Sequence, residues 1–180
     1  KRLEGLLSMV KDLLAITRME KTTTYMTFES MNIKEIVLEV VGSLESSARE
    51  KGEEVIVEIE DTPPIQADET SMFQLFTNLV SNAIKYNKDN QNVEITGRRA
   101  GNGIEIAVRD HGIGMTKEQM AHIWEPFYRV KSDEVKKISG TGLGLSIVRK
   151  IVDNHRGSID ADSKPGEGTV FTLFLPFEQD

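Results

Sequence analysis

The sequence contains 180 residues and carries a formal net charge of −7, with no cysteine. This length supports one substantial hydrophobic core with an attached helical segment. The acidic balance argues against general nucleic-acid binding, the lack of cysteine excludes disulfides and thiolate metal sites, and no run approaches the roughly 18 apolar residues of a membrane span.

Residues 1–24 are predicted to form a separate helix. An apolar stripe recurs at alternating four- and three-residue intervals, at Leu3, Leu7, Val10, Leu14 and Thr17. This spacing is typical of a coiled-coil helix, which should pack on another helix or on a second copy of itself. Periodicity alone supports a core helix of the main domain equally, and the polar stretch 20–24 favours the separate helix. Because the chain starts with Lys1 inside this pattern, we expect it to be part of a longer protein.

Residues 25–180 alternate between predicted strands and helices. The strand-like runs are 26–30, 54–60, 92–99, 103–110, 157–163 and 168–176. The helix-like segments are 32–51, 69–86 and 143–155, and Asp68 and Thr70 offer N-caps for the second. The short turn 100-AGNG-103 predicts neighbouring antiparallel strands. The expected fold is an α/β (α+β) two-layer sandwich with a mixed, partly antiparallel sheet and one helical layer.

The predicted helix 69–86 carries polar residues on one face. Asn78, Asn82 and Lys85 follow one another at four- and three-residue spacing, so they share that face. Its apolar residues, among them Leu75, Leu79 and Ile84, are expected to face the core. An amide oxygen can hold Mg²⁺ while phosphates and water complete its shell, and Lys85 adds positive charge. One Asn would be read as solvated, but two aligned with a Lys favour a binding face.

Asp110 ends the predicted strand 103–110 and is followed by His111, Gly112 and Gly114. A carboxylate at a strand end can accept a hydrogen bond from an exocyclic amine, and glycines let a planar base approach the backbone. The neighbouring His111 also raises the alternative of an Asp–His catalytic couple. In isolation, an ordinary turn after a strand is the favoured interpretation.

Residues 116–139 form a long stretch rich in Lys, Glu and Asp around one aromatic cluster, 124-WEPFYRV-130. A loop of this length inside a compact domain is usually functional or mobile, and we interpret it as a lid.

The segment 140-GTGLGLSIVRK-150 places three glycines before an amphipathic helix, whose N-terminal N–H groups could receive phosphate oxygens. It is not a P-loop, because no Lys-Ser or Lys-Thr pair closes it, and Leu145 stands where a dinucleotide fingerprint needs a third glycine. A phosphate-binding loop and a hinge of the lid are equally supported by this segment alone.

The four motifs NLVSNAIKYN, DHGIGM, WEPFYR and GTGLGLSIV occur in this order, with 166-GEGT-169 after them. Together they resemble the N, first-glycine, F and second-glycine boxes of bacterial two-component sensor histidine kinases. The resemblance covers 28–176 as the catalytic ATP-binding domain of the GHKL superfamily, whose fold also serves gyrase, mismatch-repair ATPases and a heat-shock chaperone. Residues 2–21 resemble the second helix of the dimerisation and phosphotransfer hairpin. The hairpin's acceptor His is expected outside this sequence, because His111, His122 and His155 all lie in the other domain.

The resemblance implies that the chain binds ATP and Mg²⁺, with the base at one end of the site. Asp110 would bind the adenine amino group, and His111 would be a bystander. Gly112 and Gly114 would make room for the base. Tyr86 would pack near the base, and Thr169 would complete the adenine pocket through water.

At the phosphate end, the resemblance implies that Asn78 and Asn82 hold Mg²⁺ and that Lys85 approaches the phosphates. The phosphates would be lined by Gly140, Thr141, Gly142, Leu143 and Gly144. Tyr128 belongs to the same cofactor-binding set, and Arg129 would reach the γ-phosphate when the lid closes. In the water-splitting ATPases of the superfamily a Glu occupies the position of Asn78. Because a carboxamide cannot take a proton as a carboxylate does, transfer to a side chain is favoured over hydrolysis, with Asn78 and Arg129 as catalytic residues.

The implied function is that of a protein histidine kinase, which transfers the γ-phosphate to a hairpin histidine for relay to the receiver domain of a response regulator. The intact protein would be a homodimer through the hairpin, with this portion in the cytoplasm, membrane attachment only through upstream segments and no nucleic-acid partner. Two alternatives remain: a non-catalytic nucleotide-binding regulatory module and a serine kinase of the anti-sigma type.

Overall fold

The computed structural model describes residues 26–131, 135, 138 and 140–178, so the predicted hairpin helix 1–24 lies outside the described residues. A five-stranded sheet has the order β2-β4-β5-β7-β6. Its strands are β2 (Val55–Ile59), β4 (Val93–Ala100), β5 (Gly103–Asp110), β7 (Gly168–Pro176) and β6 (Ser158–Lys164). β2 and β4 are parallel, and the remaining neighbours in this sheet are antiparallel.

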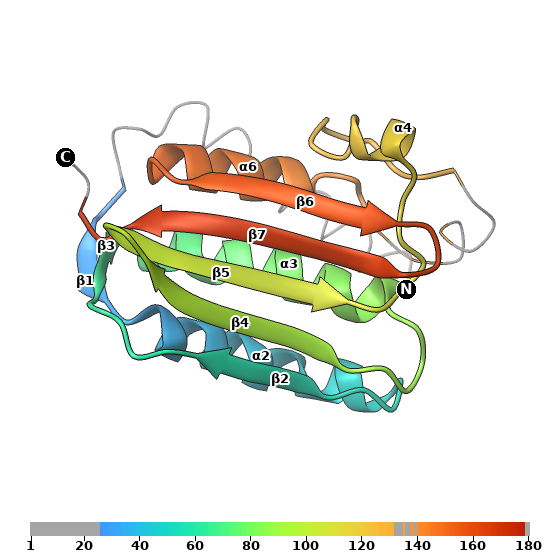
Figure 1. The fold of residues 1–180 in the computed structure, drawn as a ribbon, viewed down its shortest axis with the longest axis horizontal. Coiled ribbons are helices and arrows are strands. Elements are labelled where there is room, and N and C mark those ends of the chain that lie inside the picture. The colour runs from blue at the N-terminus through green and yellow to red at the C-terminus, as the bar shows by residue number, and fades with distance from the viewer. Residues whose placement is uncertain (1–25, 132–134, 136–137, 139, 179–180) are drawn as a thin grey trace.

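Helices α2 (Ile33–Arg49), α3 (Glu69–Tyr86) and α6 (Gly144–Asn154) cover one face of this sheet (Figure 1). The predicted two-layer sandwich with a mixed sheet is therefore confirmed, including the β4–β5 hairpin closed at Ala100 and Gly103. Within the described ranges, no helix has the length and apolar character needed to cross a membrane.

Two short elements escaped the sequence analysis. β3 (Ile65–Ala67) pairs with β1 (Glu29–Met31) in a small antiparallel sheet, and three residues are too few for an alternation pattern to be recognised. The helix α4 (Lys117–Met120) lies within the predicted lid. Thr116 and Gln119 close a capping box at its start, which is a signal that the sequence does contain.

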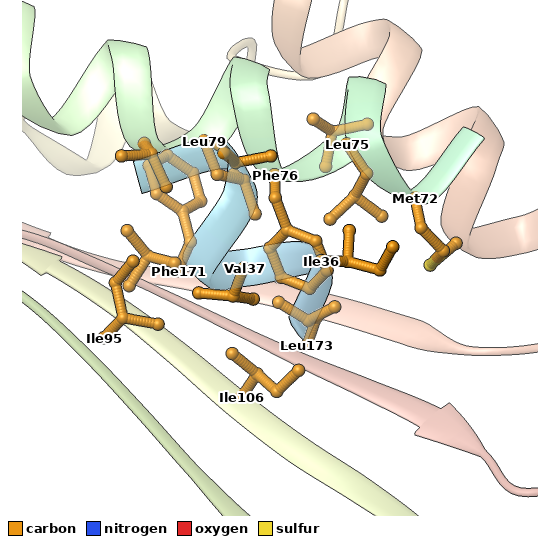
Figure 2. Packing of buried hydrophobic residues seen from close by; sticks show 14 of the residues in the cluster. Ile36, Val37, Met72, Leu75, Phe76, Leu79, Ile95, Ile106, Phe171 and Leu173 are labelled. Atoms are coloured by element: carbon orange, nitrogen blue, oxygen red, sulfur yellow. The ribbon is translucent and has the colours of Figure 1, made fainter. Parts of the chain in front are cut away.

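The hydrophobic core fills the space between the helices and the sheet. Figure 2 shows Ile36 and Val37 of α2 and Phe76 of α3 directed toward Ile106 and Leu173 of the sheet. The apolar residues expected to face the core, Leu75, Leu79 and Ile84, are all buried. Their burial turns the Asn-bearing face of α3 away from the sheet.

α3 and α6 are joined where α3 begins and α6 ends. Asp68 is the N-cap of α3, and its Oδ1 accepts the backbone N–H of Ser71 at 2.9 Å. The backbone N–H of Asp68 donates to Nε2 of the fully buried His155 at 3.1 Å, while Nδ1 of that ring donates to the carbonyl of Ile151. At the other end of α6, Gly144 contacts Asn78 near the middle of α3. The two helices therefore run antiparallel, with the start of α6 beside the polar face of α3.

Candidate functional site

A cavity of about 380 Å³ lies between α3, the ends of β5 and β7, the first part of the predicted lid and the start of α6. Most residues predicted from the sequence line it: Asn78, Asn82, Lys85, Tyr86, Asp110, Gly114, Tyr128, Arg129, Gly140, Thr141, Gly142, Gly144 and Thr169. Segments separated by up to about half the chain thus contribute polar groups to one space. Apolar walls that were not predicted as part of the site come from Ile113, Met115, Ile123, Val130, Leu145 and Phe171.

Gly112 and Leu143 do not line the cavity. They hold in place two segments that form its walls. A side chain at Gly112 would collide with the carbonyl oxygen of Tyr86, so glycine lets the turn after β5 press against the end of α3. Leu143 is fully buried, and its backbone N–H donates to Oγ1 of Thr141 at 3.3 Å. Its side chain anchors the glycine-rich segment in the core.

Asp110 occupies one end of the cavity with only 6% of its surface exposed. Its Oδ1 accepts the backbone N–H groups of Gly112 at 2.9 Å and Thr169 at 3.2 Å. Burial raises the pKa of Asp110, and these two hydrogen bonds partly oppose that rise. Among the described groups no donor lies on Oδ2. The carboxylate is therefore held rigidly by one oxygen and keeps the other as an acceptor.

His111 does not form a couple with Asp110. Its Nε2 lies 3.3 Å from Oε1 of Glu94 on the neighbouring strand β4, and its ring is not part of the cavity wall. Its backbone N–H donates to Oδ1 of Asn87 at 2.8 Å. The structure thus separates the two neighbours in sequence, with Asp110 in the cavity and His111 outside it.

Asn87 is a supporting residue that the sequence analysis missed. It is buried, and it caps the C-terminus of α3 while its Nδ2 donates to the carbonyl of Gln91 at 2.7 Å. With its bond to His111 it ties the turn after β5 to the end of α3. The last letter of the motif NLVSNAIKYN was the available signal, but an Asn after a helix is read as an ordinary cap.

The opposite end of the cavity combines amide oxygens with a helix N-terminus. Nδ2 of Asn78 donates to the carbonyl of Gln74 at 3.0 Å, which fixes its Oδ1 on the side facing Gly144. A Cβ at Gly144 would lie only 3.0 Å from that oxygen. Leu143, the N-cap of α6, supplies no side-chain acceptor, so the cap leaves the first N–H groups for another acceptor.

This donor set fits Mg²⁺ bound together with phosphates. No group of three His, Cys, Asp or Glu side chains able to hold a metal occurs in the part of the chain that the structure describes. Asn78 and Asn82 line this end of the cavity, where their amide oxygens can serve as hard ligands, and Lys85 lies one turn further on. A cation held by these oxygens requires phosphate and water oxygens to complete its coordination.

The aromatic cluster and the glycine-rich segment are packed together at the base of the lid. The backbone N–H of Phe127 donates to the carbonyl of Gly142 at 2.9 Å, and a Cβ at Gly142 would lie 2.8 Å from the Phe127 backbone. The guanidinium of Arg129 donates to the carbonyls of Val135 at 3.1 Å and Ile138 at 2.6 Å. Arg129 therefore lines the cavity while it organises the lid backbone. Trp124 makes an edge contact with Phe171, a residue of the cavity wall.

Comparison with known proteins identifies relatives of this chain. Residues 67–179 match the model of the family described as histidine kinase-, DNA gyrase B-, and HSP90-like ATPase. The sensor-like histidine kinase SenX3 of Mycolicibacterium smegmatis is 34% identical over 171 residues, which are 95% of this chain and 44% of that protein.

Two solved structures extend the similarity to the fold. Full-length ShkA in complex with AMPPNP has a TM-score of 0.83 at 28% identity, over 97% of this chain and 36% of that one. The histidine kinase ThkA in complex with the response regulator protein TrrA has a TM-score of 0.76 at 26% identity, over 98% of this chain and 48% of that one. The chain thus spans less than half the length of these relatives. The matches confirm the resemblance predicted from the four sequence motifs.

Proposed function

This chain belongs to the family of histidine kinase-, DNA gyrase B-, and HSP90-like ATPases, and we propose that its cavity binds ATP in one orientation. The adenine lies at the Asp110 end, and the phosphates lie at the start of α6. The observation that carries this proposal is the pairing of a buried carboxylate, anchored by one oxygen, with a helix N-terminus across the same cavity. The AMPPNP complex of ShkA supports a nucleotide as the ligand.

The proposed phosphate end uses Mg²⁺ held by the oxygens of Asn78 and Asn82. The cation neutralises phosphate charge when bound, and Lys85 adds a positive charge on the same face of α3. The N–H groups at the start of α6 and the segment 140–144 receive phosphate oxygens. Arg129 completes the charge balance at the lid once the lid folds over the nucleotide.

In the intact protein, the proposed activity is transfer of the γ-phosphate to a histidine on a dimerisation hairpin. Asn78, at the position where a water-activating carboxylate would stand, holds its amide nitrogen on a backbone carbonyl and offers no base to a water molecule. The names of the relatives favour this activity over the regulatory-module and serine-kinase alternatives.

A proposed assembly of the intact protein accompanies this activity. Its partner is the receiver domain of a response regulator, as supported by the ThkA–TrrA complex. We further propose a homodimer formed through the hairpin and a cytoplasmic location for this portion. Segment 1–24, which would contribute the second hairpin helix, lies outside the described residues.

ATP binding is tested by calorimetric titration of the chain with ATP, with Mg²⁺ and with a chelator. Asn82→Ala should abolish most of the Mg²⁺-dependent gain in affinity, because one of two protein ligands is lost. Asn102→Ala, at the exposed β4–β5 turn, is the matched control and should bind as the parent chain does. Equal Mg²⁺ dependence in the parent chain and Asn82→Ala would remove Asn82 from the metal site.

Phosphoryl transfer is tested by supplying a complete hairpin, separately or fused, and measuring acid-labile phosphate from labelled ATP. Label is expected with the hairpin and not with the 180-residue chain alone. A chain that binds ATP but never labels any hairpin histidine would leave the nucleotide site standing and refute the kinase activity.

A further inference from the structure

Ser163 lies beside the Asp110 end of the cavity and has no role in the site as proposed above. Strands β6, β7 and β5 lie side by side in the sheet (Figure 1). In their register, Ser163 of β6 pairs with Thr169 of β7, and Thr169 pairs with Asp110 of β5. Residues paired directly across neighbouring strands share one face of a sheet. The three side chains therefore form a single row that ends at the cavity.

Three hydrogen bonds meet at the hydroxyl of Ser163. Its Oγ accepts the backbone N–H of Met115 at 2.9 Å, donates to the carbonyl of Gly168 at 2.9 Å and lies 2.9 Å from Oγ1 of Thr169. A hydroxyl has one proton and two lone pairs. Because the Gly168 carbonyl can only accept, the Ser163 proton is used there, and the proton of the third bond must come from Thr169.

This assignment fixes the direction in which the Thr169 hydroxyl donates its proton. Its hydroxyl proton is directed to Ser163, so Thr169 presents lone pairs to the cavity that it lines. Asp110 already uses Oδ1 for two backbone N–H groups and presents Oδ2, a second acceptor. Two acceptors at one end of a cavity suit an exocyclic amine, which brings two N–H groups, and oppose a ring carbonyl, which brings only lone pairs.

We propose that Ser163 is a positioning residue for base selection: it holds the Thr169 hydroxyl as an acceptor, so that Thr169 and Asp110 together select a 6-amino purine over a 6-oxo purine. The proposal rests on the proposed function, because it assumes that the base lies at this end of the cavity. Ser163 acts through Thr169 and contacts no nucleotide atom itself. The bond to Met115 also fixes the backbone that forms the adjoining wall.

The test compares affinities for ATP and inosine triphosphate, whose base carries a 6-oxo group, by calorimetry on the full chain. Ser163→Ala should weaken ATP binding about three- to tenfold, as expected for one lost hydrogen bond, and change inosine triphosphate binding less than about twofold. Thr169→Val should lower the ATP preference similarly. The ATP affinity of the double variant should be no lower than that of the weaker-binding single variant, because both substitutions remove the same Ser163–Thr169 hydrogen bond. Ser163→Thr keeps a hydroxyl and should restore the ratio.

Ser158→Ala, at the exposed start of the same strand, is the control and should leave both affinities unchanged. Thermal unfolding without nucleotide checks that Ser163→Ala is folded. Equal weakening of both nucleotides, or additive effects in the double variant, would show a merely structural role and overturn the inference. If the parent chain binds neither nucleotide, the proposed function fails. If it prefers ATP and Ser163→Ala keeps that preference, only the role of Ser163 fails.

Discussion

Replacing Asp110 by Asn separates the charge of this side chain from its shape. The amide oxygen of Asn can still accept the backbone N–H groups of Gly112 and Thr169, so the turn after β5 should remain in place. Burial raises the pKa of Asp110, which means that folding destabilises the carboxylate relative to its neutral form. That contribution to stability is complete below the usual Asp pKa and is lost as the pH rises through the raised value. Near neutral pH, the free energy of unfolding of nucleotide-free Asp110→Asn should therefore equal or exceed that of the parent chain.

ATP binding should respond in the opposite direction. The amide nitrogen replaces Oδ2, so a donor faces the adenine amine, which is itself a donor. A hydrogen bond to a charged group contributes about 1.5–3 kcal/mol, which corresponds to a loss of ATP affinity of roughly 10- to 100-fold. Inosine triphosphate carries an acceptor at the same position, and its affinity should rise in the variant.

The assay is calorimetric titration of both variants with the two nucleotides, alongside denaturant unfolding. Asp160→Asn on the exposed face of β6 is the matched control, since it makes the same chemical change far from the cavity, and both affinities should be unchanged. Equal ATP affinity in Asp110→Asn and the parent chain would remove Asp110 from the base site. Equal losses for both nucleotides would mean that the substitution disturbs the cavity rather than the recognition of the amine.

Three further predictions concern the sheet beside Asp110, the buried His155 and the lid residue Trp124. In chemical denaturation, Gly168→Ala should destabilise the domain by about 1–3 kcal/mol more than Gly166→Ala. Both glycines have positive φ, but only at Gly168 would a Cβ collide with the carbonyl oxygen of Asp110. Equal losses of stability in the two variants would refute that close approach. Burial lowers the pKa of His155, so below about pH 6.5 the unfolded chain binds a proton that the folded chain does not. The free energy of unfolding should therefore fall as the pH decreases through that window. His155→Gln should flatten this dependence of stability on pH, and an unchanged dependence would exclude His155 as its source. The fluorescence of Trp124, the only tryptophan, should change on ATP addition through its contact with Phe171. Trp124→Phe should lose this signal and keep the ATP affinity within about twofold. Unchanged Trp124 fluorescence under conditions where calorimetry detects ATP binding would show that the surroundings of Trp124 in the lid do not respond to the nucleotide.

The fold was predictable where the pattern is long and where burial alone decides it. α3 matched its predicted limits because Asp68 caps it and its apolar residues recur on one side over the whole helix. β5 and β7 likewise matched their predicted runs, since inward and outward side chains alternate along them. β3 was missed because a three-residue strand with one neighbour is specified by its pairing with β1 rather than by its own sequence.

The candidate site divides in the same way. Asp110 and Asn82, which line the cavity, could be predicted as candidates because each belongs to a motif with a recognisable order. Asn87 and Ser163 were missed because each acts through partners that only the fold brings close: the backbone N–H of His111 in one case, and Met115 and Thr169 in the other. Gly112 and Leu143 were assigned to the right segments, but sequence could not show that one is pressed against Tyr86 and the other buried in the core.

The two ends of the cavity are built with different degrees of constraint, and this has a consequence for recognition. At the base end, the backbone of Gly168 lies against Asp110 and that of Gly114 against Lys164, so sheet and turn leave little room for adjustment. At the phosphate end, the walls depend on lid contacts, such as the Arg129 bonds to two carbonyls and the Phe127 bond to Gly142. Because the base end is ordered when the domain folds, ATP binding does not have to order it, and base selectivity should be independent of the lid. Lid closure should instead depend on the phosphates. The cavity would then recognise the base at one end and the number of phosphates at the other, independently of each other.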